Sequence, residues 1–189
     1  MPILILASAS PRRKEYLALL DFPYECDAAD VDETVHEPLC AADYAMEVAK
    51  RKAKAVLGKH KNSYVLGADT VVVYDGLFLG KPKDEEHAFQ MLSLLQGHSH
   101  EVYTGICLYT PEGKCFQDYR CTKVSMACLR PEEIWAYINT KEPMDKAGAY
   151  GIQGRGAALI EKIDGCYFNV VGLPIHATKR LLKTAGYPF

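Results

Sequence analysis

The stretch ILILASASPRR, residues 3–13, decides the fold class because it joins an apolar run to the start of a helix. Ile3 to Ala7 form a short continuous apolar run, which is typical of a buried strand. A serine-rich turn follows, in which Ser10 suits the helix N-cap and Pro11 the first helical position. A buried strand that leads straight into a helix indicates an α/β protein.

Two kinds of hydrophobic period alternate along the rest of the chain. Helical spacing predicts helices at about 41–57, ended by Gly58, and at about 84–96, and two more are expected to begin at Pro131 and after Pro174. The predicted strands cover residues 64–67, 71–74, 77–79, 100–109, 115–129, 157–163 and 167–171. Asp-Gly turn signals at 75–76 and 164–165 predict hairpins that join 71–74 to 77–79 and 157–163 to 167–171.

The order of these elements predicts a mixed α/β protein rather than a strictly alternating one. With 189 residues, of which 49% are hydrophobic, the chain is large enough to bury a proper core. We therefore expect a single domain over residues 1–189, built as one or two lobes. Residues 142–156 carry four glycines without any helical or alternating period, which predicts a loop.

Composition excludes several classes of function. The 22 basic and 24 acidic residues give a net charge of −2, which disfavours a nucleic-acid binder that relies on a basic surface. The N-terminal apolar run is too short for a signal peptide or a membrane span, and we expect a soluble cytoplasmic protein without membrane contact. The seven cysteines lack Cys-x-x-Cys spacing, so we expect reduced thiols, mostly in the core.

Three cations, Arg12, Arg13 and Lys14, occupy the predicted first turn of the first helix. That end of a helix carries a partial positive charge, so cations there cost stability unless an anion binds nearby. The hydroxyls of Ser8 and Ser10 and the arginine side chains can bind phosphate oxygens. The alternative is that the cations point into solvent, but the serine-rich turn favours a phosphate site.

Two lysines further along the chain are candidates for the same anion. Lys52 falls on the apolar stripe of the helix at 41–57, so its ammonium group either reaches the rim of the protein or an internal anion. Lys81, in the sequence Gly80-Lys81-Pro82 after the predicted hairpin, lies on a restricted backbone.

Two carboxylates could serve as oxygen ligands or as a base. Asp69 lies between two strand-like runs, which predicts a position at a strand end or a sharp bend. There it could hold a divalent cation or accept a proton from an attacking water, although a turn-forming aspartate is also common. Glu33, in an acidic stretch at 30–33, could be a second ligand or a solvated loop residue.

Cations, carboxylates and a glycine-rich loop together are what phosphoryl transfer requires. The sequence has neither a Walker motif, because Pro82 follows Gly80-Lys81, nor a Gly-x-Ser-x-Gly motif. His98 and His100 are interpreted as surface residues rather than as metal ligands.

Four motifs carry a resemblance to a known family: LASASPRR at 6–13, GADTVV at 67–72, GKP at 80–82 and EPMDKAGAYGIQG at 142–154. In this order and spacing they are similar to Maf proteins, also called septum formation proteins, along nearly the full chain. The resemblance implies an elongated fold like that of inosine triphosphate pyrophosphatases. Such a fold has a mixed twisted sheet with flanking helices, two lobes around a deep central cleft and, usually, a homodimer.

The resemblance also implies hydrolysis of a nucleoside triphosphate to a monophosphate and pyrophosphate, with a divalent metal cation, Mg²⁺ or Mn²⁺. Asp69 is then the proton acceptor and a metal ligand, and Glu33 is a further ligand. The remaining implied roles are catalysis by Lys52 and Lys81, triphosphate binding by Ser8, Ser10, Arg12 and Arg13, and base selection by Arg13, Thr70 and Gln153.

Residues 146–153 separate the branches of this family. The sequence KAGAYGIQ is similar to the dTTP and UTP pyrophosphatase branch, whereas the 7-methyl-GTP branch has a Ser-Glu pair near the position of Gln153. An amide can both donate to and accept from a pyrimidine edge. Three alternatives to dTTP and UTP hydrolysis remain. They are a non-catalytic nucleotide-binding regulator of septum formation, an enzyme for modified nucleotides such as 5-methyl-UTP and pseudo-UTP, and a 7-methyl-GTP pyrophosphatase.

Overall fold

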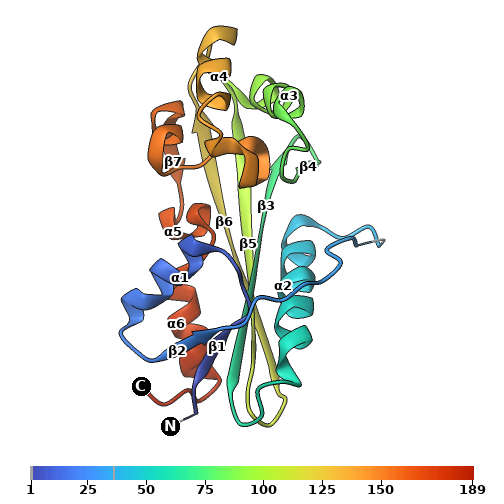
Figure 1. The fold of residues 1–189 in the computed structure, drawn as a ribbon, viewed down its shortest axis with the longest axis vertical. Helices are drawn as coiled ribbons and strands as arrows, with labels where there is room; N and C mark the ends of the chain where they lie inside the picture. The colour runs from blue at the N-terminus through green and yellow to red at the C-terminus, as the bar shows by residue number, and fades with distance from the viewer. Residues whose placement is uncertain (1, 36) are drawn as a thin grey trace. The chain divides into compact units, whose positions relative to one another are not determined.

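The computed structural model describes residues 2–35 and 37–189 (Figure 1). The chain divides into two compact units. Unit 1 comprises residues 1–69, 104–120 and 172–189, and unit 2 comprises residues 70–103 and 121–171. Three long strands contribute residues to both units.

Within the described residues, the strands form a seven-stranded sheet in the order β2-β1-β3-β5-β6-β7, with β4 paired to β3. β1 runs parallel to both β2 and β3, whereas β4 and β7 are antiparallel to their partners. The predicted mixed sheet is therefore confirmed. The strands are β1 (Leu4–Leu6), β2 (Tyr24–Cys26), β3 (Tyr64–Tyr74), β4 (Leu77–Leu79), β5 (Ser99–Tyr109), β6 (Cys115–Met126) and β7 (Ile160–Asp164).

Helices accompany the strands in both units. Unit 1 holds α1 (Pro11–Leu17), α2 (Ala41–Leu57), α6 (Ile175–Thr184) and the 3₁₀ turn η1 (Ala18–Leu20). Unit 2 holds α3 (Glu85–Leu95), α4 (Pro131–Ile138), α5 (Tyr167–Val171) and the 3₁₀ turns η2 (Glu142–Asp145), η3 (Ala147–Ala149) and η4 (Gly154–Leu159). The predicted loop at 142–156 thus contains short turns but no regular helix or strand.

The strands of unit 1 bury both of their faces, because successive side chains of a strand point to opposite sides. Leu4 and Leu6 of β1 pack in one cluster with residues of α1 and α6. Ile5 and Ala7 pack in another cluster with residues of α2. The apolar run at the N-terminus is therefore continuous because helices cover the sheet of unit 1 on both sides.

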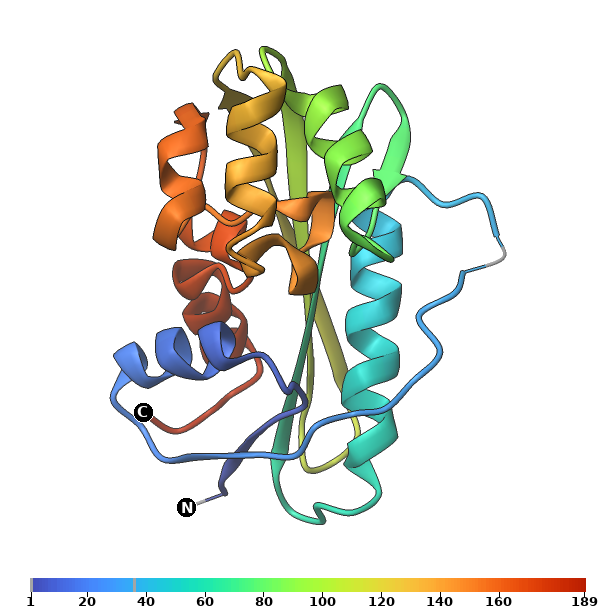
Figure 2. The same ribbon diagram turned by 45° about the horizontal axis from the view of Figure 1, so that its top comes forward.

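The helix starts and the second core follow the sequence closely. Ser10 caps α1 by accepting a hydrogen bond from the Arg13 amide at 3.4 Å, and Pro11 is the first helical residue, as predicted. In unit 2, α3 and α4 lie side by side (Figure 2), and the rings of Phe89 and Trp135 stack with centroids 4.9 Å apart. Both helices bury an apolar face in the core of this unit.

The prediction that Asp69 lies at a strand end or bend is wrong. Residues 64–67 and 71–74 belong to one continuous strand, β3, and Asp69 lies within it. An aspartate usually interrupts a buried strand because its charge is costly there. Here the charge is compensated by Lys52, whose Nζ lies 2.6 Å from the carboxylate, so the strand continues.

The prediction of a strand at 167–171 is also wrong, because these residues form α5, and β7 pairs with β6. A short apolar run does not distinguish a strand from a buried helical turn. The buried Asn169 fixes the helical form by donating to the carbonyl of Val102 at 2.8 Å and to Thr122 Oγ1 at 2.9 Å.

Two smaller expectations are corrected as well. The cysteines are free thiols, but only Cys107 is buried, and five of the seven are exposed. His98 is exposed as expected, whereas His100 is buried.

Among the helices of the described residues, none has both the length and the apolar character needed to cross a bilayer.

Candidate active site

The candidate site of unit 1 is centred on a close ion pair between α2 and β3. Lys52 Nζ lies 2.6 Å from Asp69 Oδ1, and the two side chains are 11% and 10% exposed. Of the two positions foreseen for Lys52, the rim of the protein and an internal anion, the structure shows the second. The pair places a positive and a negative group next to each other at a nearly buried position.

A glycine allows this approach of helix and strand. A Cβ atom at Gly67 would lie 2.1 Å from the carbonyl oxygen of Ala49 and 2.9 Å from the amide nitrogen of Ala53. Only a residue without a side chain permits α2 to pack so closely on β3. Gly67 and Asp69 share one face of β3, so the same close packing brings Lys52 to Asp69.

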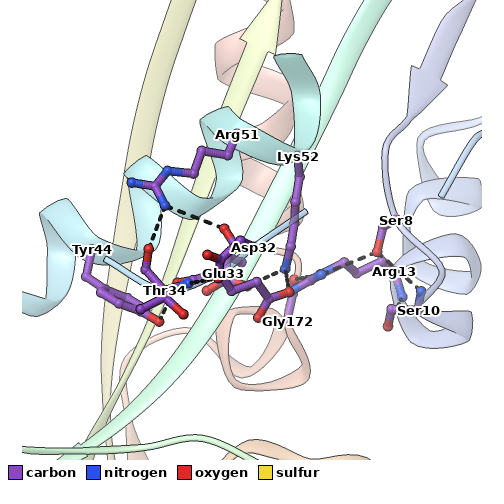
Figure 3. A network of polar contacts seen from close by, with 11 residues as sticks. Ser8, Ser10, Arg13, Asp32, Glu33, Thr34, Tyr44, Arg51, Lys52 and Gly172 are labelled. Carbon is purple, nitrogen blue, oxygen red and sulfur yellow. Dashed lines mark hydrogen bonds and ion pairs between the residues drawn. The ribbon is translucent and has the colours of Figure 1, made fainter. Parts of the chain in front are cut away.

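The same ammonium group binds a second carboxylate. Lys52 Nζ lies 2.7 Å from Glu33 Oε1, and the Glu33 side chain is 56% exposed (Figure 3). Two carboxylates therefore share one lysine, one of them nearly buried and the other open to solvent. Glu33, expected either as a ligand or as a solvated loop residue, reaches the candidate site.

Side chains of α2 hold the loop segment that carries Glu33. Arg51 donates to the carbonyl of Thr34 at 2.7 Å, and Tyr44 Oη donates to the carbonyl of Glu33 at 3.1 Å (Figure 3). The Thr34 amide in turn donates to Asp32 Oδ1 at 2.8 Å. A loop without regular structure is thus tied to the helix that also bears Lys52.

Arg13 turns back toward the protein rather than into solvent. Its Nε donates to the carbonyl of Gly172 at 2.8 Å, and its Nη1 donates to Ser8 Oγ at 3.3 Å (Figure 3). Ser8 is buried, and its hydroxyl also accepts from the amide of Ser10 at 3.2 Å. The serine-rich turn therefore positions an arginine side chain, as well as capping the helix.

The charges of this unit influence one another. Burial lowers the pKa of Arg13, while the negative charges of Asp69 and Glu33 oppose that shift and the positive charge of Arg12 adds to it. Burial raises the pKa of Asp69, against the opposing effect of Lys52 and Arg13. Arg12, Arg13, Lys52, Asp69 and Glu33 thus form one electrostatic group, called the charge cluster below.

The charge cluster has oxygen ligands that suit a divalent cation. Two carboxylates already share one cation, Lys52, and carboxylate oxygens are the donors that Mg²⁺ and Mn²⁺ prefer. Among residues 2–35 and 37–189, no group of three or more acidic, histidine or cysteine side chains is arranged to hold a metal. Mg²⁺ commonly binds through one or two carboxylates together with phosphate and water, so Asp69 and Glu33 fit such an ion.

The other predicted site residues belong to unit 2. Thr70 follows Asp69 in β3, Lys81 is exposed after β4, and Gln153 is half-buried in the segment between η3 and η4. The amide of Gly148 donates to the carbonyl of Gly80 at 3.0 Å, which ties the Gly-Lys-Pro motif to the glycine-rich segment. The structure thus brings together the predicted residues of unit 1, and it joins two of the four motifs in unit 2.

Sequence reasoning missed the residues that hold these segments in place. Tyr44 and Arg51 are polar residues of an amphipathic helix, and nothing in the periodicity distinguishes them from other exposed polar side chains. Glu142 of η2 and Tyr137 of α4 were not singled out either. A carboxylate directly before Pro143, at the start of a glycine-rich segment, was the only available signal.

Comparisons with known proteins agree with the four motifs. A family model described as Maf-like protein matches residues 3–185. A Geobacillus sp. (strain WCH70) protein named dTTP/UTP pyrophosphatase is 50% identical over 187 residues, which is 99% of this chain and 100% of that protein. A Bacillus cytotoxicus protein of the same name is 52% identical over 179 residues, 95% of this chain and 93% of that protein.

A solved structure supports the fold. The Staphylococcus aureus Ham1 protein matches with a TM-score of 0.50 at 16% identity, over 83% of this chain and 79% of that chain. At this identity the likeness concerns the fold alone. The family model and the relatives at about 50% identity show that the chain belongs to the Maf family.

Proposed function

We propose that this protein is a nucleoside triphosphate pyrophosphatase that hydrolyses dTTP and UTP to the monophosphate and pyrophosphate. Relatives of 43–52% identity over nearly the whole chain bear the name dTTP/UTP pyrophosphatase. The observation that carries the proposal is the charge cluster, in which one nearly buried lysine bridges two carboxylates beside an arginine held by Ser8. Such a cluster suits a substrate that brings several negative charges and needs a base.

Asp69 is the proposed proton acceptor. Burial raises its pKa, and a more basic carboxylate takes a proton from water more readily. Lys52 fixes the carboxylate through its contact with Oδ1, which keeps the base in one orientation. We place the attack of the water at the α-phosphorus, because cleavage there releases pyrophosphate as one group.

The cations of the cluster bind the triphosphate in this proposal. Arg12, Arg13 and Lys52 supply positive charge, Ser8 and Ser10 supply hydroxyl groups, and Lys81 acts as a further catalytic cation. Asp69 and Glu33 would hold a divalent cation, Mg²⁺ or Mn²⁺. When bound, this ion neutralises negative charge that develops on the phosphate oxygens.

Base selection is assigned to Arg13, Thr70 and Gln153. The amide of Gln153 carries both a donor and an acceptor, which can match the O4 and N3–H groups of thymine or uracil. We further propose that the enzyme acts as a homodimer, which light scattering on a sizing column would test by its mass relative to the 21.0 kDa chain.

A substrate panel tests the proposed function. The purified protein is incubated with each common nucleoside triphosphate, and with 5-methyl-UTP, pseudo-UTP and 7-methyl-GTP, in Mg²⁺ or Mn²⁺, and pyrophosphate and orthophosphate are measured separately. We expect pyrophosphate from dTTP and UTP, and no turnover after the metal is removed with EDTA. Orthophosphate as the sole inorganic product, or turnover restricted to 7-methyl-GTP, would contradict the proposal.

A further inference from the structure

The Glu142 carboxylate organises the glycine-rich segment of unit 2. It accepts hydrogen bonds from Tyr137 Oη at 3.0 Å, from the Arg155 amide at 3.0 Å and from the Gly156 amide at 2.9 Å. Burial opposes the charge of this carboxylate, but the three donors outweigh burial and lower its pKa. Glu142 is therefore an ionised acceptor for backbone groups thirteen and fourteen residues further along the chain.

Tyr137 fixes the opposite end of the same segment. Its hydroxyl oxygen accepts a hydrogen bond from the Gly151 amide at 3.1 Å while it donates to Glu142. Tyr137 belongs to α4, and it is buried in the core of unit 2. The segment 151–156 is thus attached at both ends to one tyrosine–glutamate pair.

The backbone between these attachments is tightly folded. A Cβ atom at Gly156 would lie 2.2 Å from the carbonyl oxygen of Gly151 and 2.6 Å from Tyr137 Oη. Gly154 has a φ of 63°, in the left-handed region that favours glycine. Gln153 directly precedes this glycine, so its backbone lies between Gly151, which Tyr137 holds, and the amides at 155 and 156, which Glu142 holds.

A lysine supports the segment from the other side of Gly151. Lys146 Nζ donates to the carbonyl of Glu142 at 2.6 Å and lies 2.6 Å from Asp145 Oδ1. Its aliphatic carbons pack on Gly151, where a Cβ atom would lie 2.8 Å from Lys146 Cε. The start and the middle of the glycine-rich segment are therefore held together by one side chain.

We infer that Glu142, together with Tyr137, is a positioning residue that fixes Gln153 and thereby sets the choice of pyrimidine base. The inference rests on the proposed function, in which Gln153 contacts the base. Uracil presents an acceptor at O4 and a donor at N3, whereas cytosine presents a donor at N4 and an acceptor at N3. A glutamine amide that can turn over satisfies either base, so discrimination requires that its backbone and side chain stay in one orientation.

The test compares kcat/KM for UTP and CTP in the wild type, Glu142→Gln, Gln153→Ala and the double variant. In Glu142→Gln, one carboxylate oxygen becomes an NH₂ group that faces a backbone N–H and cannot accept from it. We expect the UTP preference to fall about tenfold, mainly through KM, with kcat for UTP changed less than about threefold. The double variant should lose no more preference than Gln153→Ala alone, because both substitutions remove the same discrimination.

Glu161→Gln is the matched control, since Glu161 is an exposed carboxylate on β7 of the same unit. It should keep the wild-type preference. An active wild type whose UTP preference is unchanged in Glu142→Gln would overturn the inference and leave the proposed function intact. A wild type that releases pyrophosphate from no pyrimidine triphosphate would overturn both.

A second variant covers the case in which Glu142→Gln does not fold. Tyr137→Phe removes the hydroxyl that links Gly151 to Glu142, and we expect a smaller loss of UTP preference in the same direction. Hydrogen exchange adds a readout that is independent of activity. Exchange of the amides of Gly151, Arg155 and Gly156 should speed up at least tenfold in this variant, and unchanged exchange with unchanged preference would contradict the inference.

Discussion

Asp69 of unit 1 is buried and Glu142 of unit 2 is half-buried, and their surroundings shift the pKa values of the two carboxylates in opposite directions. Burial raises the pKa of Asp69, although a lysine ammonium lies 2.6 Å away. Two backbone amides and a tyrosine hydroxyl lower the pKa of Glu142 despite burial. A raised pKa suits a group that must take up a proton, and a lowered pKa suits a group that must stay ionised to hold a loop.

The largest effect is expected from Lys52→Met, which removes the ammonium group next to the Asp69 carboxylate. Without the ammonium, Asp69 keeps a nearly buried charge with less compensation, which costs about 3–5 kcal/mol of unfolding free energy. Urea unfolding at pH 7 measures this loss. Burial raises the pKa of Asp69 in the folded state, so its carboxylate takes up a proton above the ordinary aspartate pKa of 3.8. Protonation removes the uncompensated charge, and the stability lost in Lys52→Met should therefore become smaller as the pH falls toward 3.8.

A second substitution serves as the control for this prediction. Adding Asp69→Asn to Lys52→Met removes the uncompensated charge and should restore most of the lost stability at pH 7. A deficit of less than about 1 kcal/mol in the single variant, or no recovery in the double variant, would show that the ion pair does not hold α2 to β3.

A further prediction concerns His100, a buried histidine of unit 2 that is neutral in the folded protein. Its Nε2 lies 2.6 Å from Tyr150 Oη, and burial lowers its pKa from 6.5 to about 4. Because the unfolded chain takes up this proton first, stability should be complete above about pH 6.5. It should fall by about 3 kcal/mol as the pH drops toward 4.

His100→Gln keeps a hydrogen-bonding group but does not titrate in this range. Unfolding in urea at half-unit pH steps should give a flatter profile between pH 6.5 and 4 for the variant than for the wild type. Parallel profiles for the two proteins would mean that His100 is not buried in its neutral form.

Two glycine substitutions test the roles of the charge cluster in unit 1 and of the glycine-rich segment in unit 2 separately. Gly67→Ala places a Cβ atom against Ala49 of α2, and Gly156→Ala places one against Gly151, each at a cost of about 1–3 kcal/mol in stability. We expect Gly67→Ala to reduce kcat with little change in base preference, and Gly156→Ala to reduce the preference for UTP over CTP. Steady-state kinetics with UTP and CTP measures both effects. Equal changes of kcat and of UTP preference in the two variants would contradict the view that the charge cluster serves catalysis and the glycine-rich segment serves base selection.

The smallest effect is expected from Ser10→Ala. Ser10 accepts from the Arg13 amide at 3.4 Å, and the loss of such a cap costs about 1 kcal/mol. Thermal unfolding monitored by circular dichroism measures this loss. A change above about 2 kcal/mol would indicate that the serine-rich turn has a structural role beyond capping α1.

The fold was predictable wherever hydrophobic period and end signals agree. Helix α2 has the predicted bounds, Ala41–Leu57, because its alanine and valine stripe is buried and Gly58 follows it. The run Tyr167–Val171 was predicted wrongly because five residues do not define a period, and the hydrogen bonds of Asn169 to Val102 and Thr122 decide its form. Such contacts join residues far apart in the sequence and leave no local pattern.

In the candidate site, too, the predictable residues are those that stand out in a local sequence pattern. Lys52 was recognisable as a candidate because it falls on an apolar stripe, and the structure shows that its ammonium group contacts Asp69 and Glu33. Glu142 was not recognisable, because two of its three partners are backbone amides, which nearly every residue carries, and the third, Tyr137, shows no local pattern that points to it. The sequence thus indicates side chains that violate a local pattern, whereas it does not indicate side chains that hold a loop through its backbone.

The role of Asp69 is tested by comparing Asp69→Asn with the wild type for turnover and for binding. We predict that nucleotide affinity, measured by calorimetry with UTP, stays within about fivefold of the wild type while pyrophosphate release falls at least a hundredfold, because the variant keeps the cations but lacks the base. Unchanged pyrophosphate release by Asp69→Asn would contradict the proposal that Asp69 is the proton acceptor.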